Sequence, residues 1–397
     1  MKISLNYIVV VLVLTLTSIK CKDEPTQPPP EDKPTNCTYP AGNRNFTWRL
    51  DTIAWFPSTV GGVWAFSDND AYVIGTIVDD KPPYSSRIGR HWNGTVWEDN
   101  INGTWGYDEI TGTWRDISII PRNDVTGDDH FMVAVGYGAP TGIITAGIAE
   151  FDNTTKKWKS YQLQAIGELR SIWTDGKGYF IAVGDNGMVY TKDGYTVEWV
   201  YQKAPTDFSL TKITGVSKSE IYLLGRKNLP YSVTYIQIWK LNAPTWCKLF
   251  DSQDTTQQSI SMTKDDYSTD LATFRCDVTD SLQFYVIGDQ SYIFQSVGQQ
   301  LSFLKINLTL RGLPLKTNGR TALDIIAYSP SDIWIFGTRY NFYHWNGSDF
   351  QKIVIPGLPN DDMHYGDQQR MAKTRTGKLF LPTEVSSQVY VVAQGTP

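Results

Sequence analysis

The four histidines are considered first, because histidine titrates near neutral pH and binds metal ions. His91 and His344 each precede Trp-Asn-Gly, so they occupy the same position in two copies of a repeated segment. A residue that recurs with a repeat usually serves the fold, so we expect both at strand ends. His130 begins an apolar run and is expected to be structural too. His364, beside Tyr365 in an irregular segment, is kept as a candidate site residue.

Close-set carboxylates could supply the oxygen ligands that calcium prefers. Asp68-Asn69-Asp70 is such a group, but it aligns with Ser217–Glu220 and Ser329–Asp332, which predicts an ordinary turn between two strands. Asp128-Asp129 occupies the same turn. No DxDxDG loop is present, and we predict no metal and no cofactor. Two acidic pairs in longer segments remain candidates: Asp265-Asp266 and Asp361-Asp362.

The four cysteines, at positions 21, 37, 247 and 276, could in principle bind zinc or form disulfides. They show no Cys-x-x-Cys spacing, which argues against a four-thiolate zinc site, and they are too few for a dense disulfide framework. The net charge of −5 argues against a nucleic-acid partner, because such proteins usually carry a basic face.

The N-terminus has the pattern of a targeting segment. Lys2 precedes an uncharged stretch at residues 3–19 with an apolar run at 8–14, which is shorter than the ~20 apolar residues of a membrane span. We predict a signal peptide at 1–20, with an uncleaved anchor as the alternative. From Cys21 to Pro40 there are six prolines and a net charge of −2, which predicts a stiff, extended spacer at 21–45.

The composition of the 397 residues favours an all-β domain. Hydrophobic residues make up 41% and charged residues 19%, which is typical of a chain that folds. The aromatic content of 13%, together with 32 glycines and 20 prolines, indicates many short strands closed by turns.

An apolar strand that ends in glycine recurs six times after the spacer. A serine or aspartate often stands eight residues before the glycine and an acidic residue five before it, which predicts two strands joined by a polar turn. The continuous apolar run predicts burial on both faces of the second strand. The glycines are Gly75, Gly136, Gly184, Gly225, Gly288 and Gly337.

Each glycine is followed by an expected hairpin with an aromatic residue on either side of its turn. Asn93-Gly94 and Asn346-Gly347 are strong signals for two-residue hairpin turns. The aromatic pairs are Trp92 and Trp97, Phe151 and Trp158, Tyr190 and Trp199, Trp239 and Trp246, Phe294 and Phe303, and Trp345 and Phe350.

Four strands per unit, repeated about every 50 residues, predict a β-propeller over residues 46–397. The C-terminus supplies only three strands, at 371–374, 378–381 and 388–392. Residues 45–50 have the alternation of an outer strand, so we expect this N-terminal strand to complete the last blade. We predict seven blades, with six or eight as alternatives. The segment 98–116 is interpreted as an inserted hairpin, or else as the real outer pair of the first blade.

In this layout the chain resembles the secreted bacterial propellers that include Kelch-like and BNR/sialidase-like proteins. Thr191–Trp199 is similar to the Asp-box turn of BNR repeats, and His91–Trp97 resembles the W-N-G-x-x-W hairpins of bacterial propeller lipoproteins. Cys21 resembles a lipidation site, and Cys21–Glu24 resembles an acidic signal that sorts some lipoproteins outward. The resemblance implies an outer-membrane lipoprotein that faces outside and is held only by its lipid. Because Lys20 replaces the usual small residue, ordinary cleavage that leaves Cys21 and Cys37 as thiols is the alternative.

The same superfamily implies an enzymatic alternative, a secreted sialidase-like glycosidase or lyase. Sialidase-like propellers bind a substrate carboxylate with clustered arginines, and Arg170, Arg275 and Arg370 stand near the starts of expected inner strands. The family's Arg-Ile-Pro motif is missing, and no catalytic residue is assigned.

The long, irregular connections between strands are the expected place for a ligand, because loops on a rigid scaffold commonly carry function. Exposed tyrosine and tryptophan suit both protein interfaces and sugar stacking. We therefore predict a monomeric, surface-anchored, non-enzymatic module that binds a glycan or a protein. The candidate ligand-binding residues are Trp105, Tyr107, Trp114, Tyr137, Tyr231, Tyr340, His364 and Tyr365.

Overall fold

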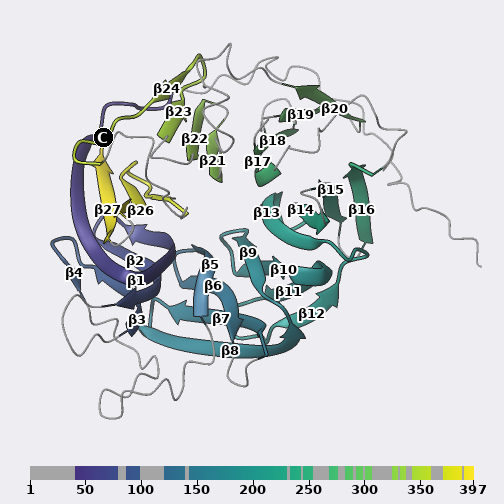
Figure 1. The fold of residues 1–397 in the computed structure, drawn as a ribbon, viewed down its shortest axis with the longest axis horizontal. Helices are drawn as coiled ribbons and strands as arrows, with labels where there is room; N and C mark the ends of the chain where they lie inside the picture. The colour runs from purple at the N-terminus through teal and green to yellow at the C-terminus, as the bar shows by residue number, and fades with distance from the viewer. Residues whose placement is uncertain are drawn as a thin grey trace, which may run out of the picture.

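Small antiparallel sheets surround a central opening in the computed structural model of the chain (Figure 1). This arrangement is a β-propeller, as predicted. The structure describes residues 41–78, 86–98, 120–138, 143–229, 233–242, 245–253, 268–275, 282–288, 292–297, 300–305, 324–329, 331–336, 342–358, 370–386 and 389–397.

Five sheets have four strands each, in the order in which the strands occur in the chain. The first contains β5 (Ile120–Gly127), β6 (Phe131–Gly138), β7 (Thr145–Asp152) and β8 (Lys157–Ile166). The second contains β9 (Leu169–Thr174), β10 (Tyr179–Gly184), the 3-10 turn η1 (Asp185–Gly187), β11 (Met188–Asp193) and β12 (Val200–Lys203). The third contains β13 (Ser209–Ser217), β14 (Glu220–Leu229), β15 (Val233–Asn242) and β16 (Thr245–Asp251).

The remaining four-stranded sheets complete the far side of the ring. One contains β17 (Ser268–Arg275), β18 (Leu282–Gly288), β19 (Tyr292–Val297) and β20 (Gln300–Lys305). The other contains β21 (Asp324–Ser329), β22 (Asp332–Phe336), β23 (Phe342–Trp345) and β24 (Phe350–Lys352).

The sixth sheet has seven strands and closes the ring. It contains β1 (Thr47–Ser67), β2 (Asp70–Val78), β3 (Ser86–Trp92), β4 (Trp97–Glu98), β25 (Ala372–Lys373), β26 (Leu379–Ser386) and β27 (Val389–Thr396). The first half of β1 pairs with β27, from Thr47 opposite Thr396 to Trp55 opposite Val389, which confirms closure by the N-terminal strand. In Figure 1 the yellow C-terminal strands lie beside purple β1.

The prediction of seven blades was wrong. Counted as hydrogen-bonded sheets, the described residues form six blades, and six was one of the two alternatives to seven. The reason lies in β1, which continues for 21 residues without a break. Its second half, from Trp55 to Ser67, pairs with β2. One strand thus serves as the outer strand for β25–β27 and as the inner strand for β2–β4, and it fuses the expected first and last blades.

The recurrent glycine has a steric cause in two of the second strands. At Gly75 in β2 an added Cβ atom would lie 2.1 Å from the carbonyl oxygen of Thr59, and at Gly184 in β10 it would lie 2.1 Å from that of Glu168. In both sheets the register shifts where the first strand meets the glycine, which brings that strand's backbone close. No side chain larger than hydrogen fits there without moving the inner strand.

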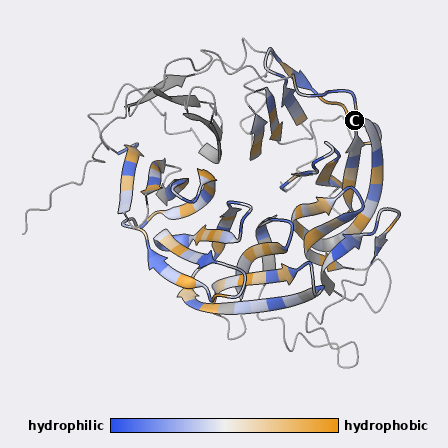
Figure 2. Ribbon diagram, turned by 180° about the vertical axis from the view of Figure 1, so that it is seen from behind, coloured by the Kyte–Doolittle hydropathy of each residue, from blue (hydrophilic) through white to orange (hydrophobic). Residues whose placement is uncertain are grey.

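Hydrophobic side chains fill the spaces between neighbouring sheets, and hydrophobic and hydrophilic residues alternate along several strands (Figure 2). The six residues of β10 are all buried, as predicted for a second strand covered on both faces. Four of the six aromatic pairs face each other directly across their hairpins. The other two do not, because Tyr190 pairs with Tyr201 and Trp246 with Leu241.

The segment that resembles an Asp box joins two sheets through a buried ion pair. Lys192 of β11 lies 2.9 Å from the Glu150 carboxylate of β7, and their side chains are 1% and 4% exposed. Trp199 donates a second hydrogen bond to Glu150 at 2.7 Å, and the Tyr161 hydroxyl donates a third at 3.0 Å. These residues hold sheets together and offer no open site.

Two further features bear on the sequence predictions. Cys247 in β16 is disulfide-bonded, and the other three cysteines lie outside the described residues. No helix in the described part of the chain is long and apolar enough to cross a membrane.

Candidate functional site

Of the eight candidate ligand-binding residues, only Tyr137 lies within the described residues. Trp105, Tyr107, Trp114, Tyr231, Tyr340, His364 and Tyr365 lie outside them, as do Cys21 and the expected hairpin at 98–116 except for its first residue. Tyr137 stands near the end of β6, half-buried, opposite Ala146 of β7 and Ile120 of β5. It therefore marks the end of the β5–β8 sheet that carries the long β6–β7 connection.

Exposed isoleucines gather at this same end of the sheet. Ile143 and Ile144 precede β7 and are 55% and 43% exposed, and Ile166 at the end of β8 is 70% exposed. Ile166 pairs with Thr145, and the Ile144 carbonyl accepts a hydrogen bond from the Gly167 amide at 3.0 Å. We call Ile143, Ile144 and Ile166 the isoleucine patch. Its aliphatic side chains stand in solvent, although aliphatic side chains of this size usually gain from burial.

An ion cluster continues directly from the isoleucine patch along the chain. Arg170 of β9 binds Asp185 of η1 through Nε at 3.0 Å and Nη2 at 3.2 Å, and its Nη1 lies 3.1 Å from Glu168. Such two-point pairing fixes the orientation of a guanidinium group. The Arg170 side chain remains 40% exposed, against 14% for Glu168 and 19% for Asp185. The arginine thus lies at the surface, with its carboxylates beneath it.

Gly167 links the patch to the cluster and holds them close. Its φ of +122° is unfavourable for other residues, and an added Cβ would lie 2.9 Å from the Asp185 side chain. The Asn123 side chain of β5 also reaches the cluster and donates to Glu168 at 3.2 Å and to the Leu169 carbonyl at 2.6 Å. The patch and the cluster therefore form one continuous surface across two sheets.

The electrostatics of the cluster keep it ionised. Burial alone would raise the pKa of Asp185, but hydrogen bonds from Arg170 and from the Glu168 amide leave that pKa below its usual value. Burial alone would lower the pKa of Arg170, and its bonds and attraction to Asp185 raise it instead. The Arg170–Asp185 pair therefore stays charged near neutral pH.

A second polar network lies deeper on the inner strands. Asp124 of β5 is 2% exposed and accepts from Arg370 at 2.7 Å, from the Ser171 hydroxyl at 2.7 Å and from the Ile172 amide at 3.0 Å. Arg370 donates in addition to the Ile172 carbonyl at 3.2 Å. These bonds tie the C-terminal strands to β5 and β9.

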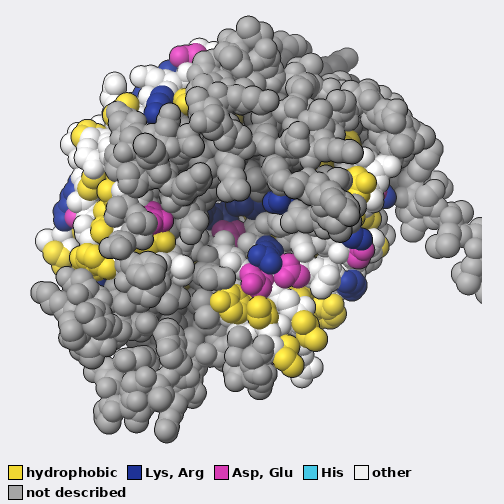
Figure 3. Space-filling model, in the orientation of Figure 1, with side chains coloured by type: hydrophobic (Ala, Val, Ile, Leu, Met, Phe, Trp, Pro, Cys, Tyr) yellow, Lys and Arg dark blue, Asp and Glu magenta, His cyan; other side chains and the backbone are white. Residues whose placement is uncertain are grey.

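The strand registers place polar residues at one level of three adjacent inner strands. Asp124, Ser171 and Lys212 each pair with the residue that precedes the recurrent glycine of the neighbouring strand. Figure 3 shows acidic and basic side chains side by side around the central opening, with hydrophobic side chains next to them. On the part of this rim that the structure describes, charged side chains therefore lie next to hydrophobic ones.

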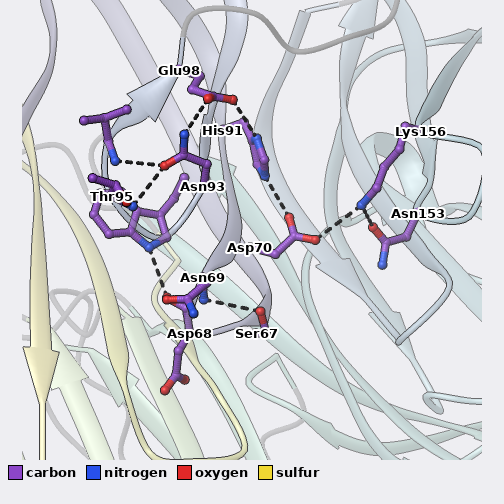
Figure 4. Close-up of polar contacts among 12 residues, drawn as sticks. Ser67, Asp68, Asn69, Asp70, His91, Asn93, Thr95, Glu98, Asn153 and Lys156 are labelled. Carbon is purple, nitrogen blue, oxygen red and sulfur yellow. Dashed lines mark hydrogen bonds and ion pairs between the residues drawn. The ribbon is translucent and has the colours of Figure 1, made fainter.

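The aspartates and histidines of the sequence analysis that the structure describes make structural contacts, whereas Asp265-Asp266, Asp361-Asp362 and His364 lie outside the described residues. Ser67–Asp70 is the predicted turn, between β1 and β2. His91 lies between two carboxylates, with Nε2 2.9 Å from Asp70 and Nδ1 3.4 Å from Glu98, and Lys156 of the next sheet also reaches Asp70 (Figure 4). Burial would raise the pKa of Asp70, but its bonds to His91 and Lys156 lower it.

The second histidine of the repeat has the same surroundings. His344 is fully buried, its Nε2 lies 2.9 Å from Asp332, and Lys373 of β25 also bonds to that carboxylate. His130 likewise lies at a turn, next to Tyr195. Within the described residues no group of three or more His, Cys, Asp or Glu side chains is placed to hold a metal ion.

The arginines considered for a sialidase-like site do not meet as one cluster. Arg170 and Arg370 belong to separate networks, and each is paired with its own carboxylates. The side chain of Arg275 lies outside the described residues. An arginine that already bonds to protein carboxylates must lose those bonds before it can bind a substrate carboxylate.

Sequence reasoning missed most of this surface. It selected mainly aromatic residues in long connections and did not select Ile143, Ile144 or Ile166. One signal was present, because Ile143-Ile144 lies inside a connection where polar residues are expected. The partners Asp185 and Asn123 gave no local signal, since each is joined to the cluster only by the fold.

Several solved structures are similar to this one. YCF48 bound to the D1 peptide shares 14% identity with a TM-score of 0.56, over 89% of this chain and 96% of that one. YCF48 from Cyanidioschyzon merolae shares 12%, with a TM-score of 0.53, over 87% and 98%. The extracellular domain of BT4673 from B. thetaiotaomicron shares 10%, with a TM-score of 0.52, over 87% and 40%. No family model and no curated protein matches the sequence, so these likenesses support the propeller fold alone.

Proposed function

We propose that the chain is a non-enzymatic binding module that holds a segment of another protein at the isoleucine patch and the Arg170 cluster. The observation that carries this proposal is the exposure of three isoleucines at strand ends that Gly167 joins to the Arg170–Asp185 pair. Aliphatic side chains gain free energy when a partner removes them from water, and arginine is enriched at binding hot spots. The apolar surface supplies affinity, and the charged cluster supplies orientation.

A similar fold gives this proposal a precedent. YCF48, whose structure contains a bound D1 peptide, is a propeller of comparable length. A short segment suits a site of this kind, because the described end of the β6–β7 connection and the β8–β9 connection meet through the hydrogen bond from Gly167 to Ile144. A glycan is the other ligand suggested by the sequence, but its usual partners are aromatic side chains, and Tyr137 is half-buried.

We place the module at the cell envelope, as a monomeric lipoprotein anchored at Cys21. The signal-like residues 1–20 and the cysteine after them support this placement. The disulfide at Cys247 also favours an oxidising compartment outside the cytoplasm. A similar structure, BT4673, is an extracellular domain.

The glycosidase alternative receives no support from the described arginines, because Arg170 and Arg370 are both engaged with protein carboxylates. A binding function does not require the ion pairs of Arg170 and Arg370 to break. The non-enzymatic function is therefore preferred.

Site-specific photo-crosslinking tests the proposal. The full chain carries a photoreactive residue in place of Ile166, or as a matched control in place of Val354, which is 57% exposed outside the patch. After illumination in envelope extract, protein adducts are expected at position 166 and not at 354. Equal adducts at both positions, or binding to a glycan array without any protein adduct, would reject a protein-binding patch.

The predicted aromatic hairpin provides a second test of the same function. Trp105, Tyr107 and Trp114 lie outside the described residues, and we propose that they extend the binding surface. Replacing all three with alanine should weaken capture of the crosslinked partner while the melting temperature stays within a few degrees. A triple variant that unfolds would assign these residues to the core instead.

A further inference from the structure

We infer that the ring is held with its hairpin turns toward the membrane, so that the isoleucine patch faces away from it. This inference rests on the proposed anchoring and deepens the proposed function, because it states from which side a partner approaches. It follows from where the N-terminal segment meets the ring and from which ends of the strands carry the patch.

Residues 41–45, which join the spacer to β1, bind the turns of the β21–β24 sheet. The Gly42 amide donates to the Ser331 carbonyl at 3.0 Å, in the turn between β21 and β22. Arg44 donates to the His344 carbonyl at 2.9 Å and forms an ion pair with Asp349 at 2.9 Å, across the turn between β23 and β24. The chain therefore reaches the ring at the hairpin-turn end of this sheet.

This attachment is closely packed. An added Cβ at Gly42 would lie 2.6 Å from the His344 ring and 2.8 Å from the Ser331 carbonyl, so the backbone passes directly over both turns. The Arg44 side chain is only 15% exposed. Phe46 then packs edge-on against Trp334, with ring centroids 5.6 Å apart. The spacer consequently leaves the ring from a fixed point.

The isoleucine patch and the Arg170 cluster lie at the opposite ends of the strands. In an antiparallel sheet, the turns that join the first to the second strand and the third to the fourth share one end. The connection between the second and third strands lies at the other end, together with the start of the first strand and the end of the fourth. This other end carries Asp185, Ile144 and Ile166. The end with the hairpin turns carries Ser331 and Asp349.

The spacer sets how far this attachment point can lie from the membrane. The 20 residues from Cys21 to Pro40 can span at most ~60 Å. To turn the patch toward the membrane, the spacer would have to pass around the outside of the ring. The opposite orientation leaves the spacer unobstructed.

Fluorescence quenching on membranes measures the orientation directly. The full, lipid-modified chain is placed on phosphatidylcholine vesicles that contain a headgroup-linked quencher. One fluorophore is attached at Lys177, in the turn between β9 and β10, or at Asp207, in the connection after β12. Both positions are exposed, and they lie at opposite ends of the strands of the same sheet. Quenching should be about twofold stronger at 177 than at 207, and deletion of residues 28–40 should increase the ratio.

Equal quenching at the two positions, or stronger quenching at 207, would overturn the inference. A full chain that does not bind vesicles would overturn it as well, because the orientation requires the anchor. Neither result would affect the crosslinking of a partner at position 166 in solution, so the proposed binding is judged separately from the orientation.

Discussion

The buried ion pair between Glu150 and Lys192 offers the sharpest test of how neighbouring sheets are held together. The Glu150 carboxylate accepts hydrogen bonds from Tyr161 and Trp199 in addition to its contact with the Lys192 ammonium. Replacing Glu150 with glutamine removes the negative charge and leaves an ammonium group that is 1% exposed. Removal of one partner of a buried pair typically costs about 3–5 kcal/mol. We expect Glu150→Gln to lower the free energy of unfolding by that amount.

The measurement is urea unfolding followed by tryptophan fluorescence, with the free energy extrapolated to water. The double variant Glu150→Gln/Lys192→Met should recover most of the loss, because it also removes the buried positive charge. Lys159→Gln serves as the control, since its pair with Glu198 is exposed on both sides and should contribute about 0–1 kcal/mol. A loss below about 1 kcal/mol in Glu150→Gln would refute the reasoning.

Three further predictions concern other parts of the ring. Gly184→Ala should lower the melting temperature strongly, since its Cβ would lie 2.1 Å from the Glu168 carbonyl oxygen. The control Gly225→Ala, whose Cβ would have its nearest contact at 3.3 Å, should lower it little. Equal effects of the two substitutions would contradict the steric explanation. Burial lowers the pKa of His344 below the 6.5 of a free histidine, so the stability contributed by its neutral form should be present above pH 6.5 and decline as the pH falls through the lowered value. His344→Gln should flatten this pH dependence, and an unchanged slope would contradict it. Deletion of 41–51 should lower the melting temperature sharply because it exposes the edge of β27, whereas deletion of 22–40 should change it little; equal effects would argue against closure by β1.

The sequence was sufficient to predict the ring and its closure. The repeat length, the position of the glycine and the alternation of apolar and polar residues along each strand are local features of the sequence. The single strand expected at 45–50 supplies the fourth strand that the three C-terminal strands lack. The number of separate sheets was not predictable in the same way. It depends on whether β1 breaks between its two pairings, and the hydrogen bonds to β27 and β2 decide this jointly.

The candidate site was much less accessible to sequence reasoning. Arg170 and Asp185 are 15 residues apart, and Arg370 and Asp124 are 246 apart, so neither pairing appears as a motif. Ile166 is the last residue of β8 and is 70% exposed, which the strand periodicity of the sequence does not reveal. Apart from Tyr137, the residues selected from the sequence lie outside the described residues, so their role in binding stays a prediction.

The central claim is that the isoleucine patch binds a protein segment. Its most direct test is the affinity of the partner crosslinked at position 166 for the full chain and for Ile144→Asp/Ile166→Asp, measured by calorimetry, with Val354→Asp as the control. Loss of a hot spot of about 2 kcal/mol corresponds to a roughly 30-fold weaker complex. We predict at least this loss in the double variant and wild-type affinity in the control. Unchanged affinity in a folded double variant would contradict the account.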